Sequence, residues 1–301
     1  MVKVNSILIT ESLNKKKLTG FTLIELAIVL VLIGLIISGI TKGGQVVTAS
    51  RLASARSLTA RSSVNNIAGL IAWYEASSKA SFKTSETTNL SNISQWNDIS
   101  ANSVINSRNL LTKTANTNIT YRLDGINRIP ALYFQNNERI TLANFYQGRI
   151  GRATIFVVFR PNFNVTTSPS ILVDSAPSQG SFYTAIKSNQ INLNAGVDGN
   201  SSTSVNAPSI VNSRDYILCA YLNSTSSQAY VNNAITSSGS AVFNSGTNNL
   251  AGLTIGASNV ATSGFTGLIS EVIIFNRPLK LQERKDVMLY LSIKYRINIV
   301  S

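Results

Sequence analysis

One carboxylate stands inside an otherwise apolar stretch near the N-terminus of this chain. Glu25 is the single charged residue among the twenty from Phe21 to Ile40. A helix of twenty residues spans ~30 Å, the thickness of the hydrocarbon core of a bilayer. A charged side chain in such a segment costs several kilocalories per mole unless it is paired, and it is a functional residue by default. The chemistry we expect of Glu25 is therefore charge pairing.

The residues around this stretch predict how it meets a membrane. Lys15, Lys16 and Lys17 come just before it, and the positive-inside rule then places its N-terminal end in the cytoplasm. The apolar core of a secretory signal is only about 7–15 residues long, so this run is too long for one. A passable signal-peptidase site follows at Val47-Thr48-Ala49, so simple secretion stays open as an alternative.

The order of residues at this junction resembles a known family. Lys-Lys-Lys-Leu-Thr-Gly followed by Phe-Thr-Leu-Ile-Glu, from Lys15 to Glu25, is similar to the N-terminus of type IV prepilins and type II secretion pseudopilins. The resemblance implies that a prepilin peptidase cuts between Gly20 and Phe21 and that Phe21 becomes an N-methylated terminus. It also implies that Glu25 pairs with the terminal amine of a neighbouring subunit. The alternative is a glutamate that reaches the lipid headgroups.

Two features depart from the family pattern. The leader of twenty residues is long for members that begin with Phe, and Lys42, Gly43 and Gly44 stand where many major pilins carry a helix-kinking proline. A minor pilin or a pseudopilin fits the sequence equally well.

Three segments are expected. Residues 1–20 form the leader, residues 21–74 form a membrane and stalk helix, and residues 75–301 form the head. Within the stalk, Ala60, Val64, Ile67 and Ile71 recur at helical spacing, so one face of the helix can pack on the head. The polar run from residue 75 to residue 92 reads as a loop.

The head is expected to be rich in strands. Short runs of β-branched and aromatic residues between turn residues predict them, at residues 128–135, 153–161, 181–187, 190–197, 215–222, 228–236, 253–258 and 267–276. Many strands in one unit favour a sandwich or jelly roll. A C-terminal helix follows, in which Leu281, Val287 or Met288, Leu291 and Tyr295 can share one face.

A second resemblance covers about residues 70–301. The runs "ISQWNDISANSVINSRNL", "IPALYF", "ATIFVVFRP", "AYVNNAI" and "GLISEVIIFNRPLKLQERKDVMLYLSIKYRI" are similar to the laminin-G-like, concanavalin A-like jelly roll of bacterial surface proteins. The resemblance implies two packed antiparallel sheets. The fold class is then α+β: a long N-terminal membrane and stalk helix, an antiparallel β-sandwich and a C-terminal helix.

The residue types argue against an enzyme. The chain has no histidine, which excludes Ser-His-Asp and Cys-His catalysis. Glycoside hydrolysis normally needs two carboxylates, and the only acids within five residues of each other are Glu283 and Asp286, on the predicted C-terminal helix. Glu271 is expected to cap or pair at a strand end, and Cys219 to be a buried, inert thiol. We expect no metal and no cofactor.

The chain is strongly basic. Its net charge is +13; residues 1–20 hold four lysines and one glutamate, so a chain cut after Gly20 carries +10. The segment from Arg108 to Arg160 has eight basic residues against two acids. Its candidate anion-binding residues are Arg128, Arg139, Arg149 and Arg152. They indicate DNA or an anionic polysaccharide as ligand, with a solvated surface as the default alternative.

These observations predict a structural subunit of a bacterial type IV pilus-like filament whose head serves adhesion or glycan contact. The alternative is a pseudopilin or minor pilin of a type II secretion or DNA-uptake machine, with a head that packs in the filament or binds DNA. The partners are then other pilin subunits, the prepilin peptidase and the inner membrane, with a glycan, a cell surface or DNA as ligand. The precursor is expected in the inner membrane, and the assembled subunit in a periplasmic or extracellular filament.

Overall fold

The computed structural model describes residues 21–101, 110–114, 117–135, 137–143, 145, 152–162, 169–175, 183–194, 203–205, 209–223, 226–232, 252–258, 260 and 262–300. The chain divides into two compact units, one up to Val47 and one from Thr48 to the C-terminus. The long helix α1 (Leu23–Arg61) crosses this boundary. The head unit therefore begins inside the helix.

The first unit is the apolar part of α1. Its large hydrophobic side chains, from Phe21 to Ile40, are all at least about half exposed in the isolated chain. Among the described residues, the helical stretch Leu23–Asn66 is long and apolar enough to cross a membrane, judged by length and composition. An apolar surface of this extent needs a covering of lipid or protein.

The predicted stalk helix is too long at its C-terminal end. Instead of running to residue 74, α1 ends at Arg61, a short 3-10 helix η1 (Val64–Asn66) follows, and β1 (Leu70–Glu75) is a strand. Gly69 has a φ of +87°, a left-handed conformation that breaks the helix and that glycine adopts at little cost. The run Leu-Ile-Ala-Trp-Tyr-Glu has the β-branched and aromatic composition of a strand, and sheet pairing overrides its helical spacing.

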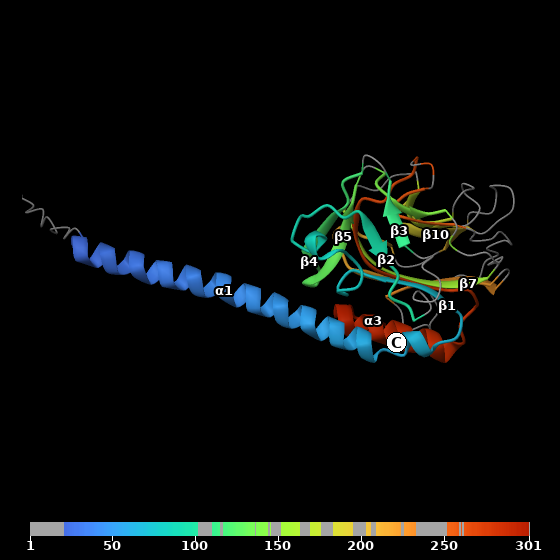
Figure 1. Cartoon of the computed structure of the whole chain (residues 1–301), viewed down its shortest axis with the longest axis horizontal. Helices are drawn as coiled ribbons and strands as arrows, with labels where there is room; N and C mark the ends of the chain where they lie inside the picture. Colours follow the sequence, from blue (N-terminus) through green and yellow to red (C-terminus); the bar gives the residue numbers. More distant parts are fainter. Residues whose placement is uncertain are drawn as a thin grey trace, which may run out of the picture. The chain divides into compact units, whose positions relative to one another are not determined.

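The head is a sandwich of two antiparallel sheets, as predicted (Figure 1). In sheet A the strand order is β13 (Gln228–Val231), β12 (Tyr216–Leu222), β7 (Ala153–Pro161), β15 (Gly267–Phe275), β5 (Ile129–Phe134) and β4 (Thr120–Ile126), with β1 also paired to β15. In sheet B the order is β11 (Thr203–Val205), β10 (Gln190–Asn194), β9 (Tyr183–Lys187), β8 (Ser170–Asp174), β14 (Leu253–Ile255), β6 (Ile140–Leu142), β3 (Leu110–Lys113) and β2 (Gln95–Asn97). A second 3-10 helix, η2 (Thr84–Glu86), lies between β1 and β2.

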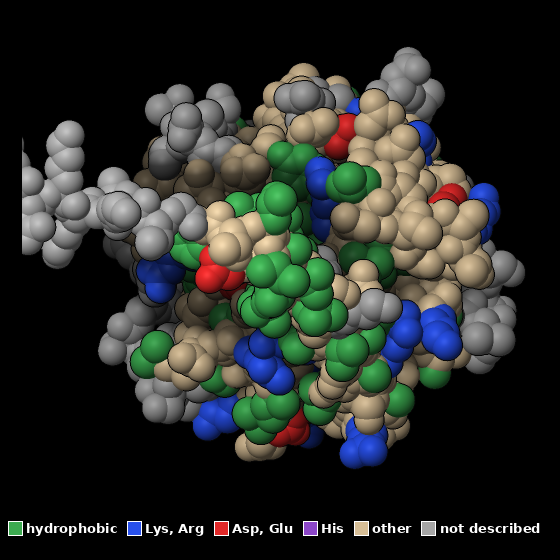
Figure 2. Space-filling view, turned by 90° about the vertical axis from the view of Figure 1, so that its left-hand side faces the viewer, with side chains coloured by type: hydrophobic (Ala, Val, Ile, Leu, Met, Phe, Trp, Pro, Cys, Tyr) green, Lys and Arg blue, Asp and Glu red, His purple; other side chains and the backbone are tan. Residues whose placement is uncertain are grey.

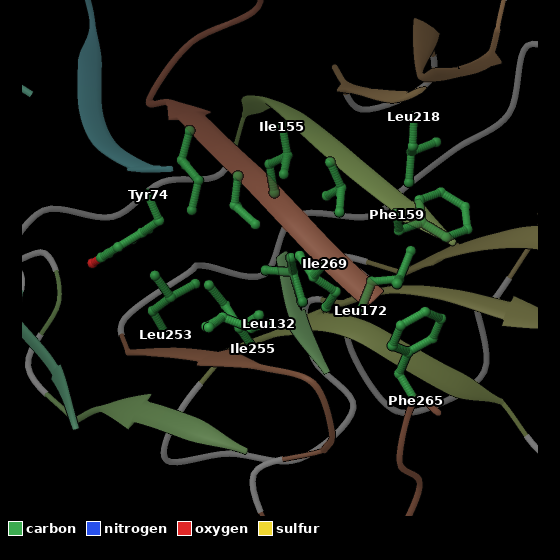
Figure 3. Close-up of a cluster of buried hydrophobic side chains, with 14 of the residues drawn as sticks. Tyr74, Leu132, Ile155, Phe159, Leu172, Leu218, Leu253, Ile255, Phe265 and Ile269 are labelled. Carbon is green, nitrogen blue, oxygen red and sulfur yellow. The ribbon is translucent and has the colours of Figure 1, made fainter. Parts of the chain in front are cut away.

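The alternation of side chains along the strands of sheet A builds two apolar cores. On β7, Ile155 and Val157 point into the core between the sheets, whereas Phe156 and Val158 point to the outer face of sheet A. Figure 3 shows the inner core, with Ile155 and Phe159 of sheet A facing residues such as Leu172 and Leu253 of sheet B. Successive side chains of a strand point to opposite faces, which explains the division.

Two helical segments cover part of the outer face of sheet A. The C-terminal helix α3 (Leu281–Tyr295) lies along it (Figure 1) and buries Val287, Met288, Leu291 and Tyr295 there. Ala55, from the part of α1 after Thr48, is buried in the same outer core. The predicted apolar face of α3 is confirmed except for Leu281, which is 46% exposed.

Candidate functional site

Thr22 and Glu25 cap the N-terminal end of α1. The Thr22 backbone N–H donates to Glu25 Oε2 at 2.8 Å, and the Glu25 backbone N–H donates to Thr22 Oγ1 at 3.3 Å. This reciprocal pair is a capping box, which satisfies two amides that a helix start otherwise leaves unpaired. The signal was present in the spacing Thr-x-x-Glu, and the sequence reasoning overlooked it. Pairing of Glu25 with a neighbouring subunit's amine stays a prediction.

The proposed cleavage junction lies at the edge of the described chain. Phe21 is 82% exposed, and Gly20 lies outside the described residues.

A buried ionic cluster occupies the outer core of the head. Glu75 ends β1 and lies directly opposite Glu271 of β15 in the strand register. Lys294, from α3, places its Nζ 2.7 Å from Glu75 Oε1 and 2.7 Å from Glu271 Oε2. All three side chains are fully buried. Glu271 does pair, as expected, but in the middle of β15 and in the interior of the outer core, so its expected location at a strand end is wrong.

Glu271 is held by four donors. Its Oε1 accepts from Trp73 Nε1 at 2.7 Å and from the Tyr290 hydroxyl at 2.9 Å. Its Oε2 accepts from Lys294 Nζ at 2.7 Å and from the Tyr295 hydroxyl at 2.8 Å. Burial raises the pKa of Glu271, and the Lys294 charge opposes that rise.

The two carboxyl oxygens of Glu75 differ in their hydrogen bonds. Its Oε1 accepts from Lys294, from the backbone N–H of Ser77 at 3.1 Å and from the Ser77 hydroxyl. Its Oε2 is buried and accepts no hydrogen bond from the described residues. Two carboxylates facing one ammonium would leave a negative charge uncompensated in the interior.

The pair of Glu75 and Glu271 shows that spacing in the sequence did not reveal which acids lie close together. Two carboxyl groups do come together in space, although Glu75 and Glu271 are far apart in the chain. They hold the same lysine nitrogen and are fully buried, so no sugar can lie between them as glycoside hydrolysis requires. Sequence reasoning missed the cluster because it placed Glu75 in a loop.

The uncovered end of the outer face of sheet A forms an open pocket of about 580 Å³. Its lining includes Arg122, Tyr133, Gln135, Arg160 and Leu268. The Arg122 guanidinium lies 5.0 Å from the centre of the Tyr133 ring. We call this pocket the sheet A pocket. An aromatic ring surrounded by side chains that donate and accept hydrogen bonds is a suitable contact for a polar ligand with an apolar face.

One cation of the sheet A pocket is already paired. Arg160 binds Asp215 in a fork, with Nε 2.6 Å from Oδ1 and Nη2 3.0 Å from Oδ2. Planar two-point contacts of this kind orient an arginine firmly.

Of the four arginines predicted as an anion-binding patch, the three that the structure describes do not share one location. Arg128 lies in the turn before β5, with a φ of +64°, and Arg139 follows the far end of that strand. Arg152 comes just before β7. Because β5 and β7 both run antiparallel to β15, the two strands start at the same end of sheet A. Arg149 lies outside the described residues. On the face in Figure 2, Lys and Arg side chains form separate groups.

Two family models match the chain. Residues 15–41 match the prokaryotic N-terminal methylation motif, and residues 134–283 match the concanavalin A-like lectin/glucanases superfamily. No curated protein matches the chain.

Solved structures are similar to the head at low identity. The binding domain of botulinum neurotoxin serotype D/C is 13% identical, with a TM-score of 0.51 over 76% of this chain and 53% of that chain. Domain 4 of AbnA, an extracellular arabinanase of Geobacillus stearothermophilus solved with arabinotriose, is 15% identical, with a TM-score of 0.49 over 73% and 98%.

A sialidase of Trypanosoma rangeli, in complex with the inhibitor DANA, is 14% identical, with a TM-score of 0.45 over 74% of this chain. The match spans only 33% of the sialidase. Sequence motif, fold and family models agree: the chain joins a prepilin-type N-terminal methylation motif to a concanavalin A-like β-sandwich.

Proposed function

We propose that this protein is a structural subunit of a bacterial type IV pilus-like filament, with a head that binds glycans or cell surfaces and performs no catalysis. The observation that carries the proposal is the methylation motif over residues 15–41, which leads directly into the exposed apolar half of α1. Such a helix can lie in the inner membrane before assembly and against the helices of other subunits afterwards. A prepilin peptidase cuts between Gly20 and Phe21, and Phe21 is then N-methylated.

Processing provides the first test. Mass spectrometry of the mature N-terminus is expected to find a methylated Phe21. A protein that starts at Ser50 would show ordinary signal-peptidase cleavage and would remove the basis for a filament subunit.

Glu25 provides the second test, because its two possible roles can be separated. The capping box needs only a side-chain acceptor, which glutamine also supplies, whereas pairing with a protonated amine needs the charge. If Glu25 pairs with a neighbour's terminus, Glu25→Gln and Glu25→Val both reduce incorporation into filaments while membrane insertion continues. Thr22→Val loses the side-chain cap but keeps the carboxylate, so it is the matched control. Normal incorporation of Glu25→Gln with poor incorporation of Glu25→Val would assign Glu25 to capping alone.

The sheet A pocket is the proposed contact for a glycan. A sugar ring has apolar C–H faces that stack on an aromatic ring, and its hydroxyl groups bond to polar side chains around that ring. Tyr133 and Arg122 offer both kinds of contact. The lectin-like fold supports a binding role, but the pocket residues carry the argument.

The runner-up is a pseudopilin or minor pilin whose head packs in the filament or binds DNA, favoured by the net charge of +10 after cleavage. One experiment compares the two ligands, with the full mature chain in detergent on a glycan array and with duplex DNA over a salt series. Glycan binding is expected to be lost in Tyr133→Ala and kept when Arg128, Arg139, Arg149 and Arg152 are all changed to Gln. The opposite pattern, with affinity that falls steeply as salt rises, would favour DNA.

A further inference from the structure

The buried ionic cluster has features that a structural ion pair does not need. The three side chains Glu75, Glu271 and Lys294 have no exposed surface. Lys294 Nζ also lies 2.9 Å from Thr59 Oγ1 and 3.0 Å from the Tyr290 hydroxyl. Lysine is almost never buried in this way unless it is fully paired. One carboxyl group and one amine, held together in the absence of bulk water, are also the reactants for an amide bond, and the second carboxyl group can transfer protons.

We propose that Lys294 and Glu75 condense to an intramolecular isopeptide bond, with Glu271 as the group that moves the proton. The bond would join β1, the first strand of the head, to α3, its last helix. It would be a modification site of the folded chain itself, since each reacting group is supplied by this protein.

The hydrogen bonds distinguish the two carboxyl groups. Glu271 has both oxygens engaged by donors, two on each. Glu75 Oε1 accepts from the N–H and the hydroxyl of Ser77, while Oε2 accepts nothing from the described residues. Donors fixed on one oxygen stabilise the charge that develops there as a nucleophile adds to the carbon. Glu75 is therefore the acyl partner, with Oε1 as the stabilised oxygen and Oε2 as the oxygen that leaves.

The reacting groups lie among aromatic side chains and have no exposed surface. Lys294 Nζ lies 5.4 Å from the centre of the Tyr290 ring and 5.2 Å from that of Tyr295. In the proposed step Glu75 is in its acid form, and one proton passes from the ammonium to Glu271, which leaves all three groups uncharged in this nonpolar site. The reacting atoms are already held by the fold, which removes the entropic cost of bringing them together.

The step balances without any other reactant. Neutral Lys294 Nζ adds to Cδ of Glu75 in its acid form, and the N–C bond forms. Glu271, already protonated by the ammonium, gives its proton to Oε2 and takes one from the nitrogen, so it is a carboxylic acid before and after this step. The Cδ–Oε2 bond then breaks and one water molecule leaves. A pocket of about 370 Å³ adjoins the cluster and is lined by Thr59, Trp73 and Glu75, which provides a route for that water.

Peptide mapping of the full chain, purified in detergent, tests the proposal. Trypsin cuts after Arg and Lys, so an unlinked chain yields peptides 62–79 and 286–294. The bond blocks cleavage after Lys294 and gives instead one branched species, 62–79 joined to 286–296, whose mass is the sum less one water. Fragmentation of that species must place the link at Glu75 and Lys294. Only the two unlinked peptides, in fresh and in aged wild-type protein alike, would overturn the proposal.

Variants test the assigned roles. Lys294→Arg keeps the positive charge and cannot form the amide, so the branched species must disappear. Glu271→Gln keeps acceptors but cannot carry the proton, so linked protein is expected to accumulate at least tenfold more slowly. Glu86→Gln, at a buried glutamate bonded to Ser94, is the matched control and is expected to link at the wild-type rate. An unchanged rate in Glu271→Gln would remove Glu271 from the mechanism.

Discussion

Replacing Lys294 with methionine isolates the electrostatic part of the buried ionic cluster. Methionine has a similar length and flexibility, so the apolar packing of α3 on sheet A is largely kept. Compared with the unlinked chain, the substitution removes the only cation within hydrogen-bond distance of Glu75 and Glu271 among the described residues. Two carboxyl groups then remain in the outer core without a counter-ion.

The size of the effect follows from that burial. Removing one partner of a fully buried pair costs ~3–5 kcal/mol, because the remaining charge is neither hydrated nor paired. For a domain of this size, such a loss lowers Tm by about 10 °C.

The loss of stability in Lys294→Met must also depend on pH, and it must grow as the pH rises. Lys294 lowers the pKa of Glu271, against the rise caused by burial; without Lys294 the pKa rises further. A carboxyl group whose pKa is higher in the folded state stabilises the fold most below its unfolded value of 4.5. That stability is lost as the pH rises through the folded pKa. Lys294→Met is therefore expected to be mildly destabilised near pH 4 and strongly destabilised near pH 8.

Thermal unfolding of the full chain in detergent, followed by tryptophan fluorescence, measures this directly because Trp73 lies in the cluster. Lys79→Met changes an exposed lysine and is the control at each pH. Adding Glu75→Gln and Glu271→Gln to Lys294→Met removes the charges and should restore most of the high-pH loss. A loss in Lys294→Met that is the same from pH 4 to pH 8 would refute the electrostatic reasoning.

Two further predictions concern the head. Cys219 is fully buried, which raises its pKa to about 12; a maleimide at pH 8 should label it only after unfolding, and rapid labelling of native protein would contradict its place in the outer core. Gly267→Ala is expected to cost ~3 kcal/mol or more in chemical denaturation, because φ is +149° and an added Cβ would lie 2.2 Å from the Arg160 carbonyl oxygen. Gly34→Ala, with nothing within 4 Å of the added Cβ, is its control and should leave the stability of the head unchanged.

Local sequence was enough for the parts of the chain whose structure depends on near neighbours. The apolar run after Gly20 predicts α1, and the run "ATIFVVFRP" predicts β7 with its observed bounds. The methylation motif is likewise a property of consecutive residues, and the family model over residues 15–41 confirms it. In each case the signal lies within one element, so no distant contact is needed to interpret it.

The end of the stalk shows where local signals fail. Ala60, Val64, Ile67 and Ile71 have the spacing of a helix, yet β1 begins at Leu70 because β15, about two hundred residues away, offers a strand to pair with. Backbone hydrogen bonds to a distant strand outweigh a small local preference.

The buried ionic cluster was decided by tertiary structure alone. Its residues come from β1, β15 and α3, and nothing in the spacing of Glu75, Glu271 and Lys294 links them. Strand register places the two glutamates opposite each other, and the packing of α3 on sheet A brings the lysine between them. The sequence by itself determined which groups could ionise and which segments were apolar. Only the fold removed water from those groups, and the absence of water is what turns three ordinary side chains into a site with chemistry of its own.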